Sequence, residues 1–293
     1  MMMERMITMR VQKRVAAIHD ISGFGKCSLT VALPILSAAG IEACAMPTAV
    51  LSTHTGGFAG YTFRDLTEDL LPFAQHWKSL NLEFDALYSG YLGSFEQLEI
   101  VSKVFETFKT ENNLIMVDPV MADYGKLYPA FSPDFAKGMA KLCAKADIIV
   151  PNLTEAALLL NEEYNPGPYT KSYIEKTLKK LHGLGPKKIV LTGVSFDEKL
   201  LGAASYDSSV NAVFYAFTKR IEGFYHGTGD VFASALLSAL MRGFELNQSA
   251  QIAADFTYES ILRTKQAGTD LRFGVNFEES IPSLLKGLDL VKR

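Results

Sequence analysis

The sequence predicts an α/β fold with a mostly parallel central sheet and helices on both of its faces, a three-layer α/β/α sandwich. Short β-type runs alternate with longer helical patterns through the first two thirds of the chain. Such alternation indicates parallel strands, because the chain returns to the same edge of a sheet through a crossover that is usually a helix. With 293 residues, of which 48% are apolar, the chain can bury a core of this kind.

Six short apolar runs are expected to form the parallel strands, since each is bounded by turn residues. They are Val15–His19, Glu42–Pro47, Ala86–Ser89, Leu114–Val117, Ile148–Val150 and Lys188–Leu191. The helical patterns between them are Cys27–Ala39, Asp65–Leu80, Phe95–Thr110, Pro133–Ala144, Thr154–Leu160 and Ser172–Leu181. Gly40 ends the first of these helices, and Pro34 inside it is expected to cause a kink or a break.

After Leu191 the pattern changes. Gly202–Tyr206 and Ala212–Phe217 are expected to be antiparallel strands joined by a turn at Asp207–Asn211. Two helices follow, at Gly229–Met241 and Gln248–Lys265. Because no repeat, low-complexity tract or linker interrupts the chain, residues 14–293 are expected to form one domain.

The N-terminal segment MMMERMITMRVQKR is basic and rich in methionine, and no long apolar stretch follows it. We expect residues 1–13 to be a disordered extension, with an internal methionine as a candidate start, and we find no signal peptide or transmembrane span. Cys27, Cys44 and Cys143 show no CxxC spacing. This argues against a disulfide framework or a zinc site and is typical of a cytoplasmic protein.

The net charge of −3 predicts neither nucleic acid nor a membrane surface as a partner. A small molecule held in a cleft is therefore the expected substrate.

The sharpest local motif is His226-Gly-Thr-Gly-Asp230, which stands directly before an apolar helical pattern. A helix start offers free N–H groups and the positive end of a dipole, so it can bind an anion such as a phosphoryl group. Asp230 in the first turn could accept a proton from an attacking hydroxyl, and the helix dipole is expected to favour its ionised form. The spacing alone is equally consistent with a helix cap that follows a glycine turn.

Polar residues also follow several predicted strands, where open α/β sheets bind their ligands. The strand ends are expected at Asp20, Asp118, Asn152 and Thr192, with Glu155 one turn beyond Asn152. Each of these alone is more often a turn or cap residue. Together at one sheet edge, Asp118, Asn152 and Glu155 would offer the hard oxygen ligands that Mg²⁺ takes, often through water.

On these motifs the chain resembles the pyridoxal kinase group of the ribokinase-like superfamily, from Arg14 to Lys286. The stretches that carry the resemblance are DISGFG (20–25), STHTGG (52–57), SGYLG (89–93), DPVMADYGKLY (118–128), PNLTE (151–155) and GTGD (227–230). The resemblance implies ATP-dependent phosphorylation of the 5′-hydroxymethyl group of vitamin B6 compounds. It also implies a homodimer, Mg²⁺ as cofactor and a monovalent cation as a further candidate.

The resemblance assigns roles to individual residues. It implies that Asp230 is the catalytic base and that Gly227, Thr228 and Gly229 form the anion hole. The implied substrate pocket consists of Asp20, Phe24, His54, Thr55 and Tyr91. The implied nucleotide contacts are Asn152, Thr192, Thr228 and Gly229, and the implied metal ligands are Asp118 and Glu155.

Three positions depart from this group's pattern. Asp20 stands where many pyridoxal kinases have Ser, and DISGFG instead resembles the hydroxymethylpyrimidine kinases of thiamin biosynthesis. Ala122 and Val150 replace a Gly and a Thr or Ser, which bears on local nucleotide geometry. Hydroxymethylpyrimidine kinase is therefore the alternative enzyme, and a non-catalytic protein that binds vitamin B6 or a nucleotide is the alternative from another class. A sugar kinase is disfavoured, because no extra strands for a lid are evident early in the chain.

Overall fold

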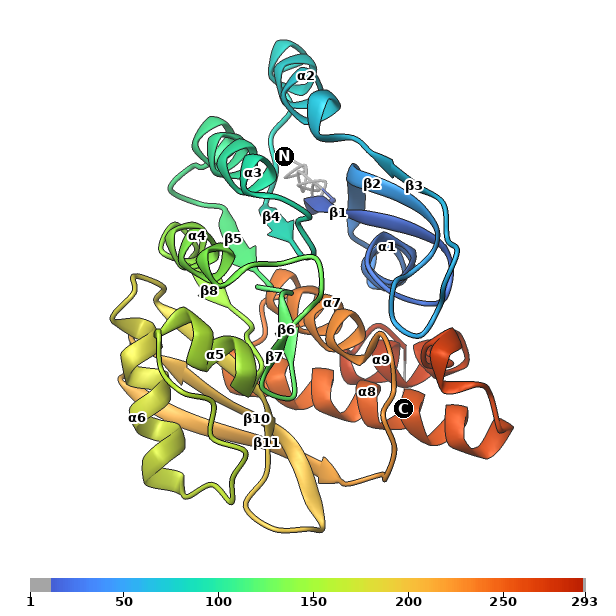
Figure 1. Ribbon diagram of the computed structural model, residues 1–293, viewed down its shortest axis with the longest axis vertical. Helices are drawn as coiled ribbons and strands as arrows, with labels where there is room; N and C mark the ends of the chain where they lie inside the picture. The colour runs from blue at the N-terminus through green and yellow to red at the C-terminus, as the bar shows by residue number, and fades with distance from the viewer. Residues whose placement is uncertain (1–11, 292–293) are drawn as a thin grey trace, which may run out of the picture.

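The computed structural model describes residues 12–291, and a nine-stranded sheet forms the centre of this part of the chain (Figure 1). Its strands are β1 (Arg14–Phe24), β2 (Glu42–Thr53), β3 (Phe63–Asp65), β4 (Ala86–Ser89), β5 (Leu114–Val117), β8 (Ile148–Ile149), β9 (Lys188–Val194), β10 (Leu200–Asp207) and β11 (Ala212–Lys219). They lie in the order β11-β10-β9-β8-β5-β4-β1-β2-β3. Neighbours from β2 to β9 pair in parallel, and β10 pairs antiparallel with β9 and β11, which confirms the predicted mostly parallel sheet and the predicted antiparallel pair.

Helices cover both faces of the sheet, as predicted (Figure 1). One face carries α2 (Thr67–Ser79), α3 (Phe95–Phe108), α4 (Pro133–Cys143), α5 (Leu153–Leu159) and α6 (Lys171–His182). The other carries α1 (Leu29–Ala38), α7 (Thr228–Met241), α8 (Leu246–Ala267) and α9 (Ile281–Gly287). Successive strand residues point to opposite faces, so Leu87 packs in the first core and Tyr88 in the second. No helix within residues 12–291 has both the length and the apolar character needed to cross a bilayer.

The first two strands are longer than the sequence predicts, and this shapes the site. β1 runs to Phe24 instead of ending at His19, and β2 runs to Thr53 instead of Pro47. The pairing of β1 with β4 stops at Ile18, whereas its pairing with β2 continues to Phe24 after a register shift between His19 and Ile21. Asp20 therefore lies inside β1, where the strand has β2 as its neighbour but no longer β4.

Other boundaries differ for local reasons. α1 continues through Pro34 to Ala38, so the predicted break is absent. β9 extends to Val194, because its pairing with β10 carries the ladder past Thr192. The sequence reading missed β3, α9, the 3₁₀ turns η1 (Leu271–Phe273) and η2 (Glu278–Ser280), and the hairpin of β6 (Ala122–Asp123) and β7 (Lys126–Leu127). These elements are too short to show a clear period. Residues 1–11 of the expected N-terminal extension lie outside the described part of the chain.

A buried amide holds the loop after β4 in place. Gln97 of α3 is 1% exposed, and its side-chain oxygen accepts a hydrogen bond from the Gly93 N–H at 2.8 Å. Its Nε2 donates to the Thr48 carbonyl at 3.1 Å and to Thr67 Oγ1 at 2.9 Å. One side chain therefore ties β2, α2 and α3 to the loop that carries Tyr91.

Replacing Gln97 should destabilise the fold. Gln97→Leu keeps the side-chain volume but leaves the Gly93 N–H and the buried Thr48 carbonyl without this partner. We expect the free energy of unfolding to fall by about 2–4 kcal/mol, measured by urea denaturation. The matched control is Gln75→Leu on the exposed face of α2, which should change it by less than about 0.5 kcal/mol. Equal losses in the two variants would contradict the proposed tie.

Candidate active site

The start of α7 lies at the carboxyl edge of the parallel strands, and Gly227 sets its geometry. Gly227 is the N-cap residue with φ 76° in the left-handed region, and a Cβ there would lie 2.0 Å from the Lys26 carbonyl oxygen. Glycine is thus required by both the backbone angle and the close approach. Gly229 differs, because a Cβ at this position would meet no atom within 4 Å. The side of the first turn that carries Gly229 is therefore open, next to N–H groups that have no partner within the helix.

Asp230 occupies the third position of α7, as predicted, and is partly buried. Burial raises its pKa to about 7, and the nearby charge of Asp20 adds to the rise. The main chain of Ser28 lies close enough to the Asp230 carboxyl group to oppose the rise. The expected preference of the helix dipole for ionised Asp230 is thus opposed by the loss of hydration on burial. A carboxyl group with this pKa can exchange a proton near neutral pH.

A second acidic group lies close to Asp230. Asp118 and Glu155 are 7% and 3% exposed. Burial raises the pKa of Asp118, and the charges of Glu155 and Asp230 raise it further. Burial likewise raises the pKa of Glu155 to about 8, although its carboxylate accepts backbone N–H bonds from Asn152 at 2.9 Å and Met121 at 3.1 Å. The structure therefore brings three predicted acidic residues into one electrostatically coupled group.

The carboxylate oxygens of Asp118 and Glu155 suit a hard cation such as Mg²⁺, provided that other ligands complete its coordination shell. Within residues 12–291, no group of three or more His, Cys, Asp or Glu residues is arranged to bind a metal by itself. Mg²⁺ commonly takes one or two carboxylates and completes its shell with water and substrate phosphates. Asp118 suits this role, since its carboxylate receives no hydrogen bond from the described residues, whereas both oxygens of Glu155 are already used.

Asn152 and Thr192 lie side by side, joined by an isolated parallel bridge. Asn152 caps α5: its Oδ1 accepts bonds from the Thr154 and Glu155 N–H groups at 2.9 Å, and its Nδ2 donates to the Ala122 carbonyl. The Thr192 hydroxyl donates to the Pro151 carbonyl at 3.4 Å. The side chain of Asn152 is thus largely occupied within the protein, as the helix-cap interpretation predicts, and its nucleotide contact stays a prediction.

Asp20 and Tyr91 of the expected ring pocket lie near each other. Asp20 is 4% exposed, and its two carboxylate oxygens accept hydroxyl hydrogen bonds from Ser28 at 2.6 Å and Ser22 at 3.0 Å. Burial raises the pKa of Asp20, and both hydroxyls oppose the rise. Burial also raises the pKa of Tyr91 to about 12, and the charge of Asp20 contributes. The Tyr91 ring packs against Phe131 at a centroid distance of 5.6 Å.

Phe24 and His54, two other residues of the predicted pocket, lie in a group of aromatic side chains near the ends of β1 and β2. Phe24 is 49% exposed, and its ring lies 4.9 Å from that of Phe273. His54 places Nε2 2.7 Å from the Arg272 carbonyl, and its Nδ1 accepts the Gly56 N–H at 3.0 Å. Both His54 nitrogens are therefore occupied by the main chain, which favours a structural role in the loop. Thr55 is exposed.

Sequence reasoning missed Ser28, Phe58 and Phe273. Ser28 lies eight residues beyond Asp20 at the start of α1, in a position that the sequence predicts to be an ordinary helix residue. Phe58 and Phe273 stack at a centroid distance of 6.3 Å, although they are far apart in the chain. The only signal in the sequence is that serine often occurs as the first residue of a helix, which applies to Ser28. No local pattern distinguishes Phe58 and Phe273 from other phenylalanines.

Comparisons with known proteins agree with this fold. The family model described as phosphomethylpyrimidine kinase matches residues 33–274. Pyridoxal kinase from Lactobacillus plantarum is 31% identical, with a TM-score of 0.86 over 97% of this chain and 100% of that one. A candidate phosphomethylpyrimidine kinase from Bacteroides thetaiotaomicron, in a crystal form with pyridoxal, is 38% identical, with a TM-score of 0.89 over 93% of this chain and 96% of that one.

A candidate pyridoxal kinase from Saccharomyces cerevisiae is 29% identical over 203 residues, which are 65% of this chain. The match spans 63% of that relative's own length.

The two glycines of the α7 start should respond differently to alanine. Gly227→Ala places a methyl group against the Lys26 carbonyl at a left-handed φ, so we expect a loss of about 2–4 kcal/mol in the free energy of unfolding. Gly229→Ala meets no neighbour and lies inside the helix, so its unfolding free energy should stay within about 1 kcal/mol of the unmodified protein. Chemical denaturation of both variants measures the contrast. Similar stabilities would show that Gly227 is not constrained as described.

Proposed function

Because the chain belongs to the phosphomethylpyrimidine kinase family, we propose that it is a kinase of vitamin B6 compounds. It transfers the γ-phosphoryl group of ATP to the 5′-hydroxymethyl group of pyridoxal, pyridoxamine and pyridoxine. The observation that carries the proposal is Asp230, a carboxyl group with a pKa of about 7 in the first turn of α7. The pyridoxal in the crystals of the Bacteroides thetaiotaomicron relative supports this substrate class.

The chemistry follows from the arrangement around α7. The 5′-hydroxyl oxygen attacks the γ-phosphorus, and the new P–O bond forms as the bond to the bridging oxygen breaks. ADP leaves with that electron pair, and the carboxylate of Asp230 takes the hydroxyl proton. Free N–H groups of Gly227, Thr228 and Gly229 at the helix start stabilise the negative charge that develops on the phosphoryl oxygens.

Two acidic residues have a supporting role in this proposal. Asp118, directly or through water, and Glu155 would hold Mg²⁺, which would neutralise charge on the β- and γ-phosphates. Asp118 is the better direct ligand, since its carboxylate is free of protein hydrogen bonds among the described residues. Asn152 and Thr192 are proposed to contact the nucleotide from the neighbouring strand ends.

Asp20, Tyr91 and Phe24 are proposed to hold the substrate ring, with Thr55 and His54 in the wall. This combination of apolar faces and one buried polar group is usual for a small-molecule site. Asp20 keeps lone pairs beyond those used by the two serine hydroxyls, so it can accept a hydrogen bond from a ring substituent.

We also propose one domain over residues 14–293, a homodimer and a cytoplasmic location. The nine-stranded sheet that runs from Arg14 to Lys219 supports a single domain. Exposed apolar side chains at Phe24, Val50 and Phe63 on the β1–β2–β3 edge support association. The three cysteines are unpaired in the described chain, as is usual in a reducing compartment.

Hydroxymethylpyrimidine kinase is the second candidate, and Asp20 is the observation that favours it, since DISGFG resembles those enzymes. A coupled assay of ATP consumption with pyridoxal, pyridoxamine, pyridoxine and hydroxymethylpyrimidine separates the proposals. We expect the three vitamin B6 compounds to be phosphorylated. Activity on hydroxymethylpyrimidine alone would establish the alternative, and binding without ATP consumption would indicate a non-catalytic protein.

Asp230→Asn should remove the base while keeping the shape of the side chain. We expect kcat to fall by about 10²–10⁴-fold with substrate and ATP binding nearly retained. In the unmodified protein the carboxyl group must be ionised to accept a proton, so kcat/KM should rise with pH through about 7. The control is Asp134→Asn in the exposed first turn of α4. Loss of binding together with turnover would make Asp230 a structural cap residue.

Asp118→Asn should raise the Mg²⁺ concentration needed for half-maximal activity by roughly 10–100-fold. It removes a charge without breaking a side-chain hydrogen bond within the described chain. Glu155→Gln is a less specific test, because an amide N–H₂ would face one of the two backbone donors that the carboxylate now satisfies. Titration with Mg²⁺ after chelation measures the effect. Full activity in excess chelator would contradict a metal requirement.

A further inference from the structure

Ser28 has an unusual backbone and an unusual hydrogen bond. It is the N-cap residue of α1 with φ 54° and ψ −132°, a region that residues other than glycine rarely adopt. A serine at this position normally caps its helix with the side-chain oxygen, but Ser28 makes no such bond. Its hydroxyl donates to Asp20 Oδ1 at 2.6 Å instead. The hydrogen bond to Asp20 therefore replaces the helix-capping bond that a serine at this position usually makes.

The same residue also faces the proposed base. Ser28 is 5% exposed, and its main chain lies close enough to Asp230 to oppose the rise in the pKa of that carboxyl group. One buried residue thus acts on two carboxyl groups, on Asp20 through a side-chain hydrogen bond and on Asp230 through its main chain. Asp20 belongs to the proposed ring pocket and Asp230 to the proposed transfer site.

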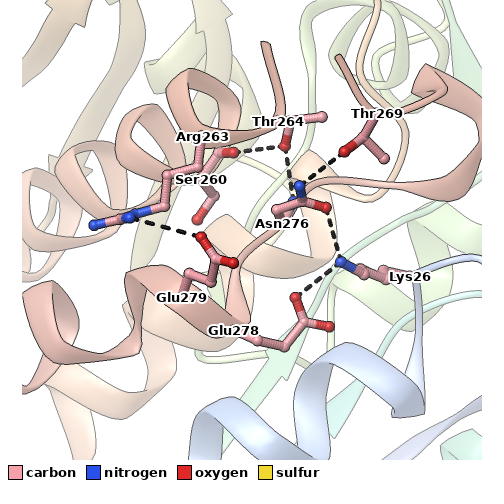
Figure 2. Close-up of polar contacts among 8 residues, drawn as sticks. All are labelled: Lys26, Ser260, Arg263, Thr264, Thr269, Asn276, Glu278 and Glu279. Atoms are coloured by element: carbon pink, nitrogen blue, oxygen red, sulfur yellow. Dashed lines mark hydrogen bonds and ion pairs between the residues drawn. The ribbon is translucent and has the colours of Figure 1, made fainter. Parts of the chain in front are cut away.

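The chain before Ser28 is anchored on the C-terminal segment (Figure 2). Lys26 donates from its backbone to the Phe273 carbonyl at 3.0 Å and from Nζ to Asn276 Oδ1 at 3.0 Å and Glu278 Oε2 at 2.9 Å. Asn276 is itself held, since its N–H donates to Thr264 Oγ1 at 2.8 Å. The carbonyl of Lys26 packs against Gly227 at the start of α7. These contacts fix residues 26–28 between α7 and the C-terminal segment, which can sustain a strained backbone at Ser28.

We propose that Ser28 is a positioning residue that sets the Asp20 and Asp230 carboxylates relative to each other, and so couples the orientation of the substrate ring to removal of the hydroxyl proton. This inference rests on the proposed function. Its physical basis is that a transferring group must be held within a small distance of the base, so a shift in one carboxylate lowers turnover even when the substrate still binds.

Ser22 provides a matched control, because its hydroxyl also donates to the buried Asp20 carboxylate, at 3.0 Å. Ser22→Ala should raise KM for the vitamin B6 substrate by about tenfold and leave kcat nearly unchanged, from the loss of one charge-assisted bond. Ser28→Ala should raise KM by a similar factor and also lower kcat by about tenfold or more. Equal kcat values in the two variants would show that Ser28 acts on Asp20 alone, and would overturn the proposal.

A variant outside the site tests the anchor and guards against a Ser28 variant that does not fold. Lys26→Met removes the two Nζ contacts and should lower kcat severalfold without changing KM for ATP. Arg263→Met is the control, since Arg263 pairs with Glu279 at 3.8 Å in the same region without contacting Lys26 (Figure 2). Equal kcat values in the two variants would show that the Lys26 contacts do not help to position Ser28, and would count against the proposal.

A stability measurement separates failure of this inference from failure of the proposed function. Ser28→Gly and Ser28→Ala both lose the hydroxyl, but glycine accommodates the positive φ. The glycine variant should therefore unfold at a higher temperature than the alanine variant, whatever the protein phosphorylates. An alanine variant that is equally stable or more stable would show that the backbone is not constrained as described. If this contrast holds and no vitamin B6 compound is phosphorylated, the proposed function has failed and the coupling role fails with it.

Discussion

Buried carboxyl groups at the carboxyl edge of the sheet impose the constraint that the rest of the site must satisfy. Burial raises the pKa of Asp20, Asp118, Glu155 and Asp230. A carboxylate taken out of water loses several kcal/mol of hydration unless hydrogen bonds, a proton or a cation replace it. Asp20 and Glu155 have two protein donors each. Asp118 has none for its side chain among the described residues, so nothing in this part of the protein replaces the hydration that its carboxylate loses.

The charges around the start of α7 explain how a phosphate could bind next to several acidic residues. The start of α7 offers free N–H groups and the positive end of its dipole, which attract an anion. The carboxylates a short distance away attract a cation. A metal–nucleotide complex carries both charges, so under the proposed function it would satisfy the two halves of the site together. Either ion alone would leave one half uncompensated.

The fold brings the ring pocket to this charged edge through the unequal lengths of its strands. β4 ends at Ser89, and the loop that follows, held by Gln97, carries Tyr91. β1 continues beyond the end of β4 and carries Asp20, with both of its oxygens bound by serine hydroxyls. Pyridoxal and hydroxymethylpyrimidine each have a flat nitrogen-containing ring and a hydroxymethyl group. Under the proposed function, discrimination between them would depend on how Asp20 meets the polar edge of the ring.

The sequence by itself determined the fold class, the mostly parallel pairing of the central strands and the position of Asp230 in the first turn of a helix. These features follow from the spacing of apolar residues along the chain. They also follow from glycines at positions whose backbone angles other residues rarely adopt, such as Gly227. The sequence also placed Asp118 directly after its strand. These features can be predicted from a short stretch of sequence, because residues that are neighbours in the chain specify a strand, a helix or a turn.

Only the tertiary structure decided the surroundings of those residues. It extended β1 through Ser22 and Gly23 to Phe24, and β2 to Thr53, because pairing with each other satisfies their backbone groups. It raised the pKa of Asp230 against the preference of the helix dipole, because hydration depends on every element packed around a group. It turned the Ser28 hydroxyl from its helix to Asp20, and it brought Phe273 to Phe24. Contacts between residues distant in sequence leave no local period, so these features could be found only once the chain was folded.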